Sequence, residues 1–565
     1  MQRKPLPIGI DDFSKLITND YYYVDKSLFI KELIDKKGEV NLFTRPRRFG
    51  KTLGLSMVRY FFENTGDKAL NEANQKLFSG LRILEQGERY TREMGQYPVI
   101  SLSLKSSKQP TWDLAYGCLI EEISREFIRH RGVIDSLATA EQKRRFLDIM
   151  NLQGSRQDFI TSVRFLSDCL FQHYGQKVMI LIDEYDVPLE NAYFEHFYKD
   201  MIGFIRSVFE SALKSNPCLE FSVITGCLRI TKESIFTGLN NPEMISILNP
   251  SYSESFGFTQ PEVNEMLEYY GLSSKMEIIK EWYNGYTFGN TQVYNPWSVA
   301  NYIKVLAASP DELPSPYWAN TSSNSIVKNL VERASVSVKE ELEIIISGGT
   351  IERPIHEEIT YDSVYDSEDN LWNFLFFTGY LTQVSRQMKQ ETQYITMRLP
   401  NLEVKYIFVN TISKWFKEQV NTRDLSPMYQ AFQDGNAGKV QMELSKLLQT
   451  SISYMDSKEA FYHGFMLGAL SNMQDYLIKS NRESGNGRLD IVVRSLDVSK
   501  PPIIIELKVS DTYKGLEAAC CAALQQIRDK EYDSWLPEEG YTDVLNYGIA
   551  FFRKQCKVKV EHHTL

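Results

Sequence analysis

A loop near the start of the chain ends in Gly50-Lys51-Thr52, a residue set suited to binding phosphate. A largely apolar run, 40–43, precedes the loop, and apolar side chains recur at helical spacing over 53–62. A strand, a loop and a helix in this order turn backbone N–H groups and the positive end of the helix toward a triphosphate. Lys51 adds a point charge and Thr52 a ligand for Mg²⁺. The predicted cofactors are therefore ATP and Mg²⁺.

Two acids, Asp183 and Glu184, directly follow five consecutive apolar residues, 178–182. Such a run indicates a strand buried on both faces of a parallel sheet, and these strands end at the edge where ligands bind. There Asp183 is placed to hold Mg²⁺ through water, and Glu184 to polarise the attacking water. The acids strengthen the ATP prediction, although the loop departs from the general P-loop pattern at Arg45, where a glycine is usual.

A third set of residues, Asp490, Glu506 and Lys508, lies near the C-terminus. Asp490 falls within a strand candidate, 487–493, and Glu506-Leu507-Lys508 ends a second apolar run. Residues two apart on a strand point to the same face, so Glu506 and Lys508 converge. Pairing of the two strands would bring Asp490 beside them.

Two carboxylates and the carbonyl of Leu507 form an oxygen-rich set that suits one or two Mg²⁺ ions. The ions would activate water, and Lys508 would position the nucleophile or neutralise developing charge. The predicted chemistry is metal-dependent hydrolysis of a phosphodiester. Asp490, Glu506 and Lys508 are its catalytic residues, and Asp490, Glu506 and Leu507 its metal ligands.

Alternating strand and helix patterns position the first two sets of residues. Strand candidates at 97–104, 178–184 and 221–226 alternate with helical patterns at 112–131 and 140–167. This order predicts an α/β fold with a parallel sheet and helices on both faces.

Between these sites the sequence indicates a mainly helical, aromatic-rich region. A helix at 371–377, a hairpin from 381–385 to 394–398, and a helix that Asn401 caps follow one another, as in a winged-helix module. Binding DNA and serving as a rigid spacer are both compatible with such a module. A polar stretch at 418–427 has the composition of a junction to the last domain.

Length and composition limit the remaining possibilities. With 565 residues the chain is long enough for about two to four domains, which we place at 1–258, 259–425 and 426–565. A net charge of −10 excludes a uniformly basic binder, although a local groove can still be positive. The seven cysteines include no Cys-x-x-Cys pair, and no long apolar run is present. Both features favour a reduced, cytoplasmic protein without membrane segments.

Three stretches together resemble a known family. They are 44–52, the acidic turn 183–186 and the segment 225–241, and they are similar to an AAA-ATPase-like family with a C-terminal PD-(D/E)XK nuclease domain. Arg45 in place of the first glycine is itself usual in that family. The resemblance implies an AAA-like P-loop domain, a helical lid with a winged-helix-like region, and a restriction-endonuclease-like α/β domain.

The resemblance also implies a nucleotide site that combines the loop with residues at two strand ends. In that site Thr52 and Asp183 would serve the magnesium ion, and Thr225 would be a polar sensor near the γ-phosphate. The predicted nucleotide-binding residues are Arg45, Pro46, Arg47, Arg48, Phe49, Gly50, Lys51, Thr52, Asp183 and Thr225.

Residues that flank the C-terminal set match the same family. Glu459 would supply a further metal ligand, and His463 would either touch substrate or pack in the interior. A glutamine and a tyrosine on the helix 516–532 would help to arrange the site or the DNA, and the candidates are Gln525, Gln526 and Tyr532. A strand at 547–552 would close the sheet.

Three functions fit these residues to different degrees. The first is an enzyme that binds and hydrolyses ATP and couples this to a Mg²⁺-dependent nuclease acting on DNA, in defence or mobile-element biology. The second is a nucleotide-gated regulatory or nucleic-acid-binding protein whose nuclease-like domain does not cleave. The third, an ATPase motor, is disfavoured by the presence of Glu506-x-Lys508. A homo-oligomer is compatible with each.

Overall fold

The computed structural model describes most of the chain, and the chain forms two compact units. One unit contains residues 1–323 and 350–406, and the other contains residues 324–349 and 407–565. The side chains of some residues within helices and strands, Glu459 among them, are not described. The described residues are 3–565 apart from 229–234, 236–241, 319–334, 358, 360, 362, 365, 422–423, 451–458, 471–472, 474–475, 485–486, 496 and 498. The domain boundaries at 258 and 425 stay a prediction.

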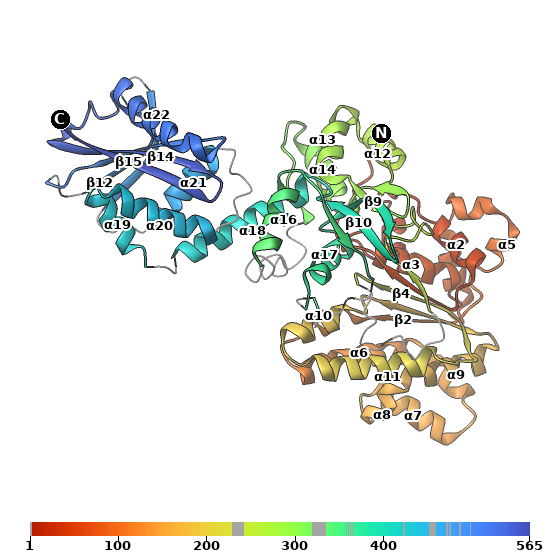
Figure 1. Ribbon diagram of the computed structural model, residues 1–565. Coiled ribbons are helices and arrows are strands. Elements are labelled where there is room, and N and C mark those ends of the chain that lie inside the picture. Colours follow the sequence, from red (N-terminus) through yellow and green to blue (C-terminus); the bar gives the residue numbers. More distant parts are fainter. Residues whose placement is uncertain are drawn as a thin grey trace. The chain divides into compact units, whose positions relative to one another are not determined.

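Five parallel strands form the sheet of the first unit, in the order β2-β3-β4-β1-β5 (Figure 1). The strands are β1 (Val40–Thr44), β2 (Val99–Ser103), β3 (Val178–Asp183), β4 (Leu219–Gly226) and β5 (Glu243–Ile245). Every residue of β3 is buried, as expected for a strand covered on both faces. Because the strands are parallel, the residues that follow β1, β3 and β4 meet at one edge of the sheet. The predicted α/β fold with a parallel sheet is confirmed.

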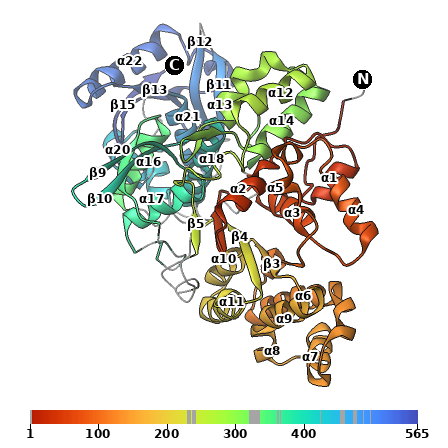
Figure 2. The same cartoon turned by 90° about the vertical axis from the view of Figure 1, so that its right-hand side faces the viewer.

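Helices cover both faces of this sheet. Figures 1 and 2 show α2, α3 and α5 on one side and α6, α9 and α11 on the other. The helices of this part are α1 (Phe13–Thr18), α2 (Leu28–Lys36), α3 (Lys51–Phe62), α4 (Lys68–Lys76), α5 (Glu88–Thr91), α6 (Trp112–Arg129), α7 (Ala140–Met150), α8 (Arg156–Ile160), α9 (Ser162–Tyr174), α10 (Val187–Phe194) and α11 (Tyr198–Leu213).

The segment 140–167, which the sequence predicts as one helical pattern, contains α7, α8 and the start of α9. A capping box separates α7 from α8. The Ser155 hydroxyl accepts from the amide of Asp158 at 3.2 Å, and the Asp158 carboxylate accepts from the amide of Ser155 at 3.0 Å. These bonds satisfy free amides at a new helix start, so the continuous helix is wrong here.

The middle region completes the first unit with short helices, a hairpin and a three-stranded antiparallel sheet in the order β8-β10-β9. The predicted helix, hairpin and helix are confirmed, and β8 adds a strand that the sequence pattern did not indicate. The elements are α12 (Gln260–Tyr270), α13 (Met276–Tyr283), β6 (Tyr286–Phe288), β7 (Thr291–Val293), α14 (Pro296–Ala308), β8 (Ile351–Pro354), α17 (Glu368–Phe377), β9 (Thr382–Lys389) and β10 (Thr392–Arg398).

Helix α18 (Leu402–Asn421) begins where predicted, because Asn401 Oδ1 accepts from the amide of Val404 at 3.1 Å. The helix runs into the stretch 418–427, which the sequence predicts as a junction. A polar composition therefore did not mark the end of the helix. A solvated helix face and a linker have the same composition, so this pattern alone does not separate them.

The second unit contains a five-stranded mixed sheet in the order β11-β12-β13-β14-β15, in which β13 and β14 are parallel. One face of the sheet packs on α19, α20 and α21, and the other packs on α22. The elements are α16 (Val336–Ile346), α19 (Ser426–Gln433), α20 (Ala437–Thr450), α21 (Glu459–Leu470), β11 (Tyr476–Ser484), β12 (Gly487–Ser495), β13 (Ile503–Val509), α22 (Leu516–Asp529), β14 (Asp543–Phe552) and β15 (Gln555–Thr564).

The predicted strand at 547–552 lies within β14 and does not close the sheet. β15 follows it and pairs antiparallel with β14 along its whole length. The sequence prediction stopped one strand early because β15 contains few apolar residues. Among the described residues, we find no helix with the length and apolarity needed to cross a membrane.

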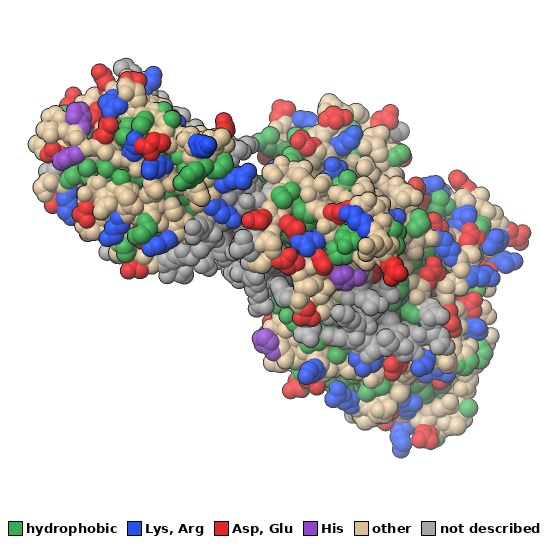
Figure 3. Space-filling view, in the orientation of Figure 1, with side chains coloured by type: hydrophobic (Ala, Val, Ile, Leu, Met, Phe, Trp, Pro, Cys, Tyr) green, Lys and Arg blue, Asp and Glu red, His purple; other side chains and the backbone are tan. Residues whose placement is uncertain are grey.

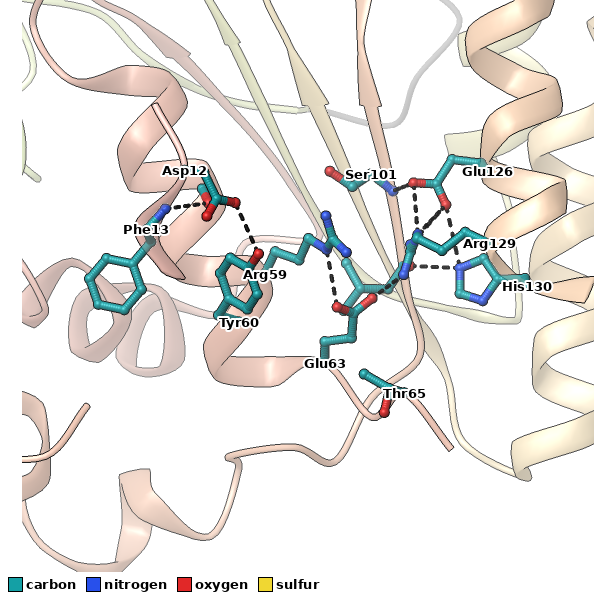
Figure 4. Close-up of polar contacts among 12 residues, drawn as sticks. Asp12, Phe13, Arg59, Tyr60, Glu63, Thr65, Ser101, Glu126, Arg129 and His130 are labelled. Carbon is teal, nitrogen blue, oxygen red and sulfur yellow. Dashed lines mark hydrogen bonds and ion pairs between the residues drawn. The ribbon is translucent and has the colours of Figure 1, made fainter. Parts of the chain in front are cut away.

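A buried ion-pair network anchors the C-terminal end of α3 to α6 (Figure 4). Glu63 follows α3 and accepts from Arg59 Nε at 3.1 Å and from Arg129 of α6. Arg129 lies 2.8 Å from Glu126, whose second oxygen accepts from the amide of Ser101 at 3.1 Å. The network fixes the helix whose first turn carries the predicted phosphate-binding residues.

Glu63→Gln should lower the free energy of unfolding of the first unit by ~2 kcal/mol, because two arginines lose a buried charged partner. Unfolding in urea, followed by circular dichroism, measures the change. Glu72→Gln is the matched control, since Glu72 is exposed and lies 3.9 Å from Lys68. It should alter the free energy by less than ~0.5 kcal/mol. Equal losses in both variants would contradict the assigned role of the network.

Candidate active sites

Three predicted residues from three elements meet at the carboxyl edge of the first sheet. Asp183 ends β3, and its carboxylate accepts from the Thr52 hydroxyl at 2.7 Å. Its other oxygen accepts from the hydroxyl of Thr225, on the neighbouring strand β4. Asp183 is 4% exposed. A carboxylate and two hydroxyls form an all-oxygen set, so these residues suit Mg²⁺.

Lys51 crosses the loop and bonds to the loop's own backbone. Its ammonium donates to the carbonyls of Arg45 at 2.9 Å and Pro46 at 3.0 Å. Gly50, just before it, has φ = +85°, a conformation that favours glycine. The lysine charge is therefore buried and held at the start of α3, where amides without helical partners also lie.

Arg45 is directed into the protein, contrary to the prediction that it binds the nucleotide. Its guanidinium is fully buried and donates to the carbonyls of Thr44 at 3.0 Å and Ile245 at 2.9 Å. Its amide donates to the carbonyl of Gly226 at 3.1 Å. These bonds tie the loop to β1, β5 and β4 and direct the guanidinium into the interior.

The remaining loop side chains also hold the loop in place. Phe49 is 1% exposed, and its ring lies 4.9 Å from that of Tyr286. Arg47 forms an ion pair with Glu190 of α10, and the Arg48 guanidinium lies 4.3 Å from the ring centroid of Trp297. Pro46 packs against Gly379, where a β-carbon would lie 2.7 Å from the proline side chain. Of the loop side chains other than Lys51 and Thr52, only that of Arg48 is exposed.

Glu184 directly follows Asp183, one of the three residues that suit Mg²⁺. It is half-buried, and its φ of +52° places it in a left-handed turn after β3. Burial and the neighbouring charge of Asp183 raise the pKa of Glu184, while Lys51 opposes the rise. A carboxylate with a raised pKa beside a phosphate site is a stronger base toward water, which is the role predicted for Glu184.

Asp186 is a residue whose role the sequence did not assign. Its carboxylate is buried and accepts from the amides of Cys227 at 2.7 Å and Leu228 at 3.1 Å. A β-carbon on Gly226 would lie 2.5 Å from the ring of Tyr185. Asp186 and Gly226 thus fasten the turn after β3 to the end of β4, and both belong to stretches that carry the family resemblance.

The predicted C-terminal set also assembles. Ile491 of β12 pairs with Ile505 of β13, which places the residues before and after them, Asp490 and Glu506, opposite each other. Asp490 Oδ2 accepts from the amide of Leu507 at 2.8 Å. The Lys508 ammonium lies 2.9 Å from Glu506 Oε1.

Oxygen atoms predominate in this second set. The amide of Leu507 points toward Asp490, and in a strand the carbonyl of the same residue points to the same side. Asp490, Glu506 and this carbonyl therefore suit Mg²⁺. Among the described residues, no group of three or more His, Cys, Asp and Glu side chains is placed to hold a metal. The side chain of Glu459 lies outside the described part.

Two of the family-implied residues, on α22 and just after its end, bond to each other. Gln526 Nε2 donates to the hydroxyl of Tyr532 at 3.2 Å. Burial raises the pKa of Tyr532, and the charges of Glu506 and Asp490 add to the rise. Gln525 instead bonds to Asp529 on the surface and does not join them.

Two further residues complete the surroundings of the set. His463 Nε2 lies 3.0 Å from the carbonyl of Asp490, beside the predicted metal ligands. Gly548 of β14 pairs with Glu506, and a β-carbon there would lie 2.5 Å from the carbonyl of Cys520 in α22. The missing side chain lets α22 lie directly on the sheet next to Glu506. A glycine inside an apolar strand is the sequence signal for such a close approach.

Comparison with family models agrees with this geometry. Residues 7–236 match a model described as a predicted AAA-ATPase, and residues 457–561 match the PD-(D/E)XK nuclease superfamily. The chain carries an AAA-ATPase-like domain and a PD-(D/E)XK nuclease-superfamily domain. One curated relative of the chain is an "Uncharacterized protein in vnfD 5'region" from Azotobacter chroococcum mcd 1. It is 28% identical over 412 residues, which span 72% of this chain and 69% of the relative. No solved structure matches the chain.

Gly548→Ala should destabilise the nuclease-superfamily domain by ~1–3 kcal/mol, because the added methyl group meets the backbone of α22 and must move the helix. Urea unfolding measures the loss. Gly468→Ala in α21 is the matched control, because no atom of the described residues lies within 4 Å of a β-carbon built there. Alanine has the higher helix propensity, so this variant should gain up to ~1 kcal/mol. Loss of stability in the control alone would contradict the proposed close approach.

Proposed function

We propose that this protein binds and hydrolyses ATP with Mg²⁺ and couples this to a Mg²⁺-dependent nuclease that acts on DNA. The observation that supports the proposal is the assembly of Asp490, Glu506 and Lys508, in which Asp490 accepts from the amide of Leu507 and Lys508 pairs with Glu506. If Lys508 and Glu506 formed only a structural ion pair, a second acid, Asp490, would not be needed on the neighbouring strand. The match of this region to the PD-(D/E)XK nuclease superfamily supports the same interpretation.

In the ATPase-like domain, five residues share four separable tasks. Lys51 would exchange its two backbone carbonyls for phosphate oxygens, which carry more negative charge. Thr52 and Asp183 would hold Mg²⁺, which would offset charge on the β- and γ-phosphates. Glu184 would orient and deprotonate the attacking water. Thr225 keeps the Asp183 carboxylate in place through its hydroxyl.

In the nuclease-superfamily domain, Asp490 and Glu506 would hold the divalent ion. A bound Mg²⁺ would lower the pKa of a coordinated water and offset charge on the scissile phosphate. Glu506 is 2% exposed and keeps the Lys508 ammonium on its own side of β13. Lys508 would thereby face the space where negative charge develops, which is the role expected of a lysine in this position.

The surface charge bears on how a polynucleotide would be held. Figure 3 shows Lys and Arg side chains interspersed with Asp and Glu on the visible face, without a large region of one sign. With a net charge of −10, long-range attraction to DNA is weak. Recognition would therefore depend on contacts near the catalytic residues. A DNA strand that reaches Lys508 would supply such contacts most simply.

Lys51→Ala should weaken ATP binding by about 100-fold, because the phosphates lose a charged hydrogen-bond donor. Isothermal titration calorimetry with Mg²⁺ present measures the affinity. Lys68→Ala, an exposed lysine at the start of α4, is the matched control and should bind ATP normally. Unchanged affinity in Lys51→Ala would remove the nucleotide site from the proposal.

Asp490→Asn should reduce Mg²⁺-dependent DNA cleavage by at least about 100-fold while ATP turnover is kept, because the ion loses a carboxylate ligand. Labelled single-stranded and double-stranded DNA and RNA, with and without ATP, serve as substrates. Asp497→Asn, the same change in the turn between β12 and β13, is the control and should cleave normally. Binding of DNA without cleavage by the unaltered protein would instead support the non-cleaving alternative.

A further inference from the structure

The carbonyl of Arg47, in the middle of the P-loop, bonds to a residue far along the chain. Trp318 Nε1 donates to this carbonyl at 3.2 Å. The indole is 1% exposed and packs on the ring of Tyr380, with 4.9 Å between centroids. The P-loop backbone is therefore held by a buried, well-supported side chain of the middle region, 271 positions further on.

Trp318 is in turn bonded to the first turn of α18. Its amide donates to Glu403 Oε1 at 2.9 Å, and the Ser298 hydroxyl lies 2.8 and 2.9 Å from the two carboxylate oxygens. Glu403 is fully buried, and burial raises its pKa to about 7, although the hydrogen bonds oppose the rise. A buried carboxylate is stable only while its donors stay in place, so Trp318 and α18 are constrained together.

A second connection joins the neighbouring P-loop residue to the same cluster. The Arg48 guanidinium lies over the ring of Trp297, whose indole N–H donates to the carbonyl of Tyr317 at 3.3 Å. Trp297 precedes Ser298 in α14, and Tyr317 precedes Trp318. Two consecutive P-loop residues therefore contact two tryptophans. One of these, Trp318, bonds to Glu403 itself, and the other, Trp297, is followed by Ser298, which also bonds to Glu403.

Glu403 is the second residue of α18, a single helix over Leu402–Asn421. The residues of α18 up to 406 belong to the first compact unit, and those from 407 belong to the second. Backbone hydrogen bonds join each turn of a helix to the next, so a displacement of Glu403 would alter the first turn of α18. Neither the proposed nucleotide binding nor the proposed nuclease reaction uses this buried carboxylate.

We propose that Trp318 and Glu403 are positioning residues of the P-loop, and that through them the first turn of α18 responds when nucleotide binds. The inference rests on the proposed nucleotide binding. Phosphate drawn into the loop competes for its amides and for Lys51, which now bonds to the carbonyls of Arg45 and Pro46. As the loop rearranges, the adjacent Arg47 carbonyl moves, and its hydrogen bond with Trp318 shifts or shortens.

Hydrogen–deuterium exchange of the full-length protein, with and without Mg²⁺ and a non-hydrolysable ATP analogue, tests the proposal. Amide exchange should slow at 46–52 and should change about tenfold, equivalent to about 1.4 kcal/mol, at 402–411. Protection of 46–52 with no change at 402–411 would overturn this inference and leave the proposed function standing. Absence of nucleotide binding by calorimetry would overturn the proposed function and the inference together.

Trp318→Phe removes the indole donor and keeps an aromatic ring. At saturating nucleotide, it should retain protection of 46–52 and lose the response at 402–411. Trp282→Phe, a tryptophan that packs on the α12–α14 cluster, is the matched control and should keep both responses. A full α18 response in Trp318→Phe would overturn the role of Trp318. Should that variant not fold, Ser298→Ala removes only a hydroxyl donor to Glu403 and should reduce the same response.

Discussion

Charged side chains buried among apolar residues need hydrogen-bond partners for their polar atoms, and this requirement shapes both halves of the molecule. In the first unit, Asp183 is buried at the end of β3 and finds its donors on α3 and β4. Lys51 lies at the start of the same helix and bonds to the P-loop backbone. Satisfying two buried charges thus fixes a loop, a helix and two strand ends relative to one another.

The same requirement orders the nuclease-superfamily domain. Glu506 is almost fully buried, and Lys508 on the same face of β13 offsets its charge. Asp490 accepts a hydrogen bond from the amide of Leu507, and this bond fixes the register of β12 and β13 beside the acids. Gly548 then admits α22 close to Glu506. A site assembled on paired strands and a tightly packed helix is more rigid than one on loops, which favours precise placement of a metal ion.

The middle region contacts the P-loop, so it does more than separate the two domains. Pro46, Arg47, Arg48 and Phe49 each meet a residue of other elements, and the contacts of Arg47 and Arg48 lead toward Glu403. Arg45 adds a further tie by occupying the place of the usual glycine and bonding to the carbonyl of Ile245. Residues of other elements therefore hold the loop in place, so its conformation and that of the middle region are linked.

Local sequence patterns were enough to predict most elements and the residues that could perform chemistry. An apolar run ending in two acids, Gly50-Lys51-Thr52 before a helix, and Glu506-x-Lys508 on one strand face can be recognised from periods of 2 and 3.6 residues, which are properties of the local chain. Four other features became visible only in the folded chain: Arg45 turns inward, Gln526 and not Gln525 reaches Tyr532, β15 completes the sheet, and Trp318 bonds to Arg47 and Glu403. Those partners come from distant positions, and packing and the burial of charge select them, which no local spacing encodes.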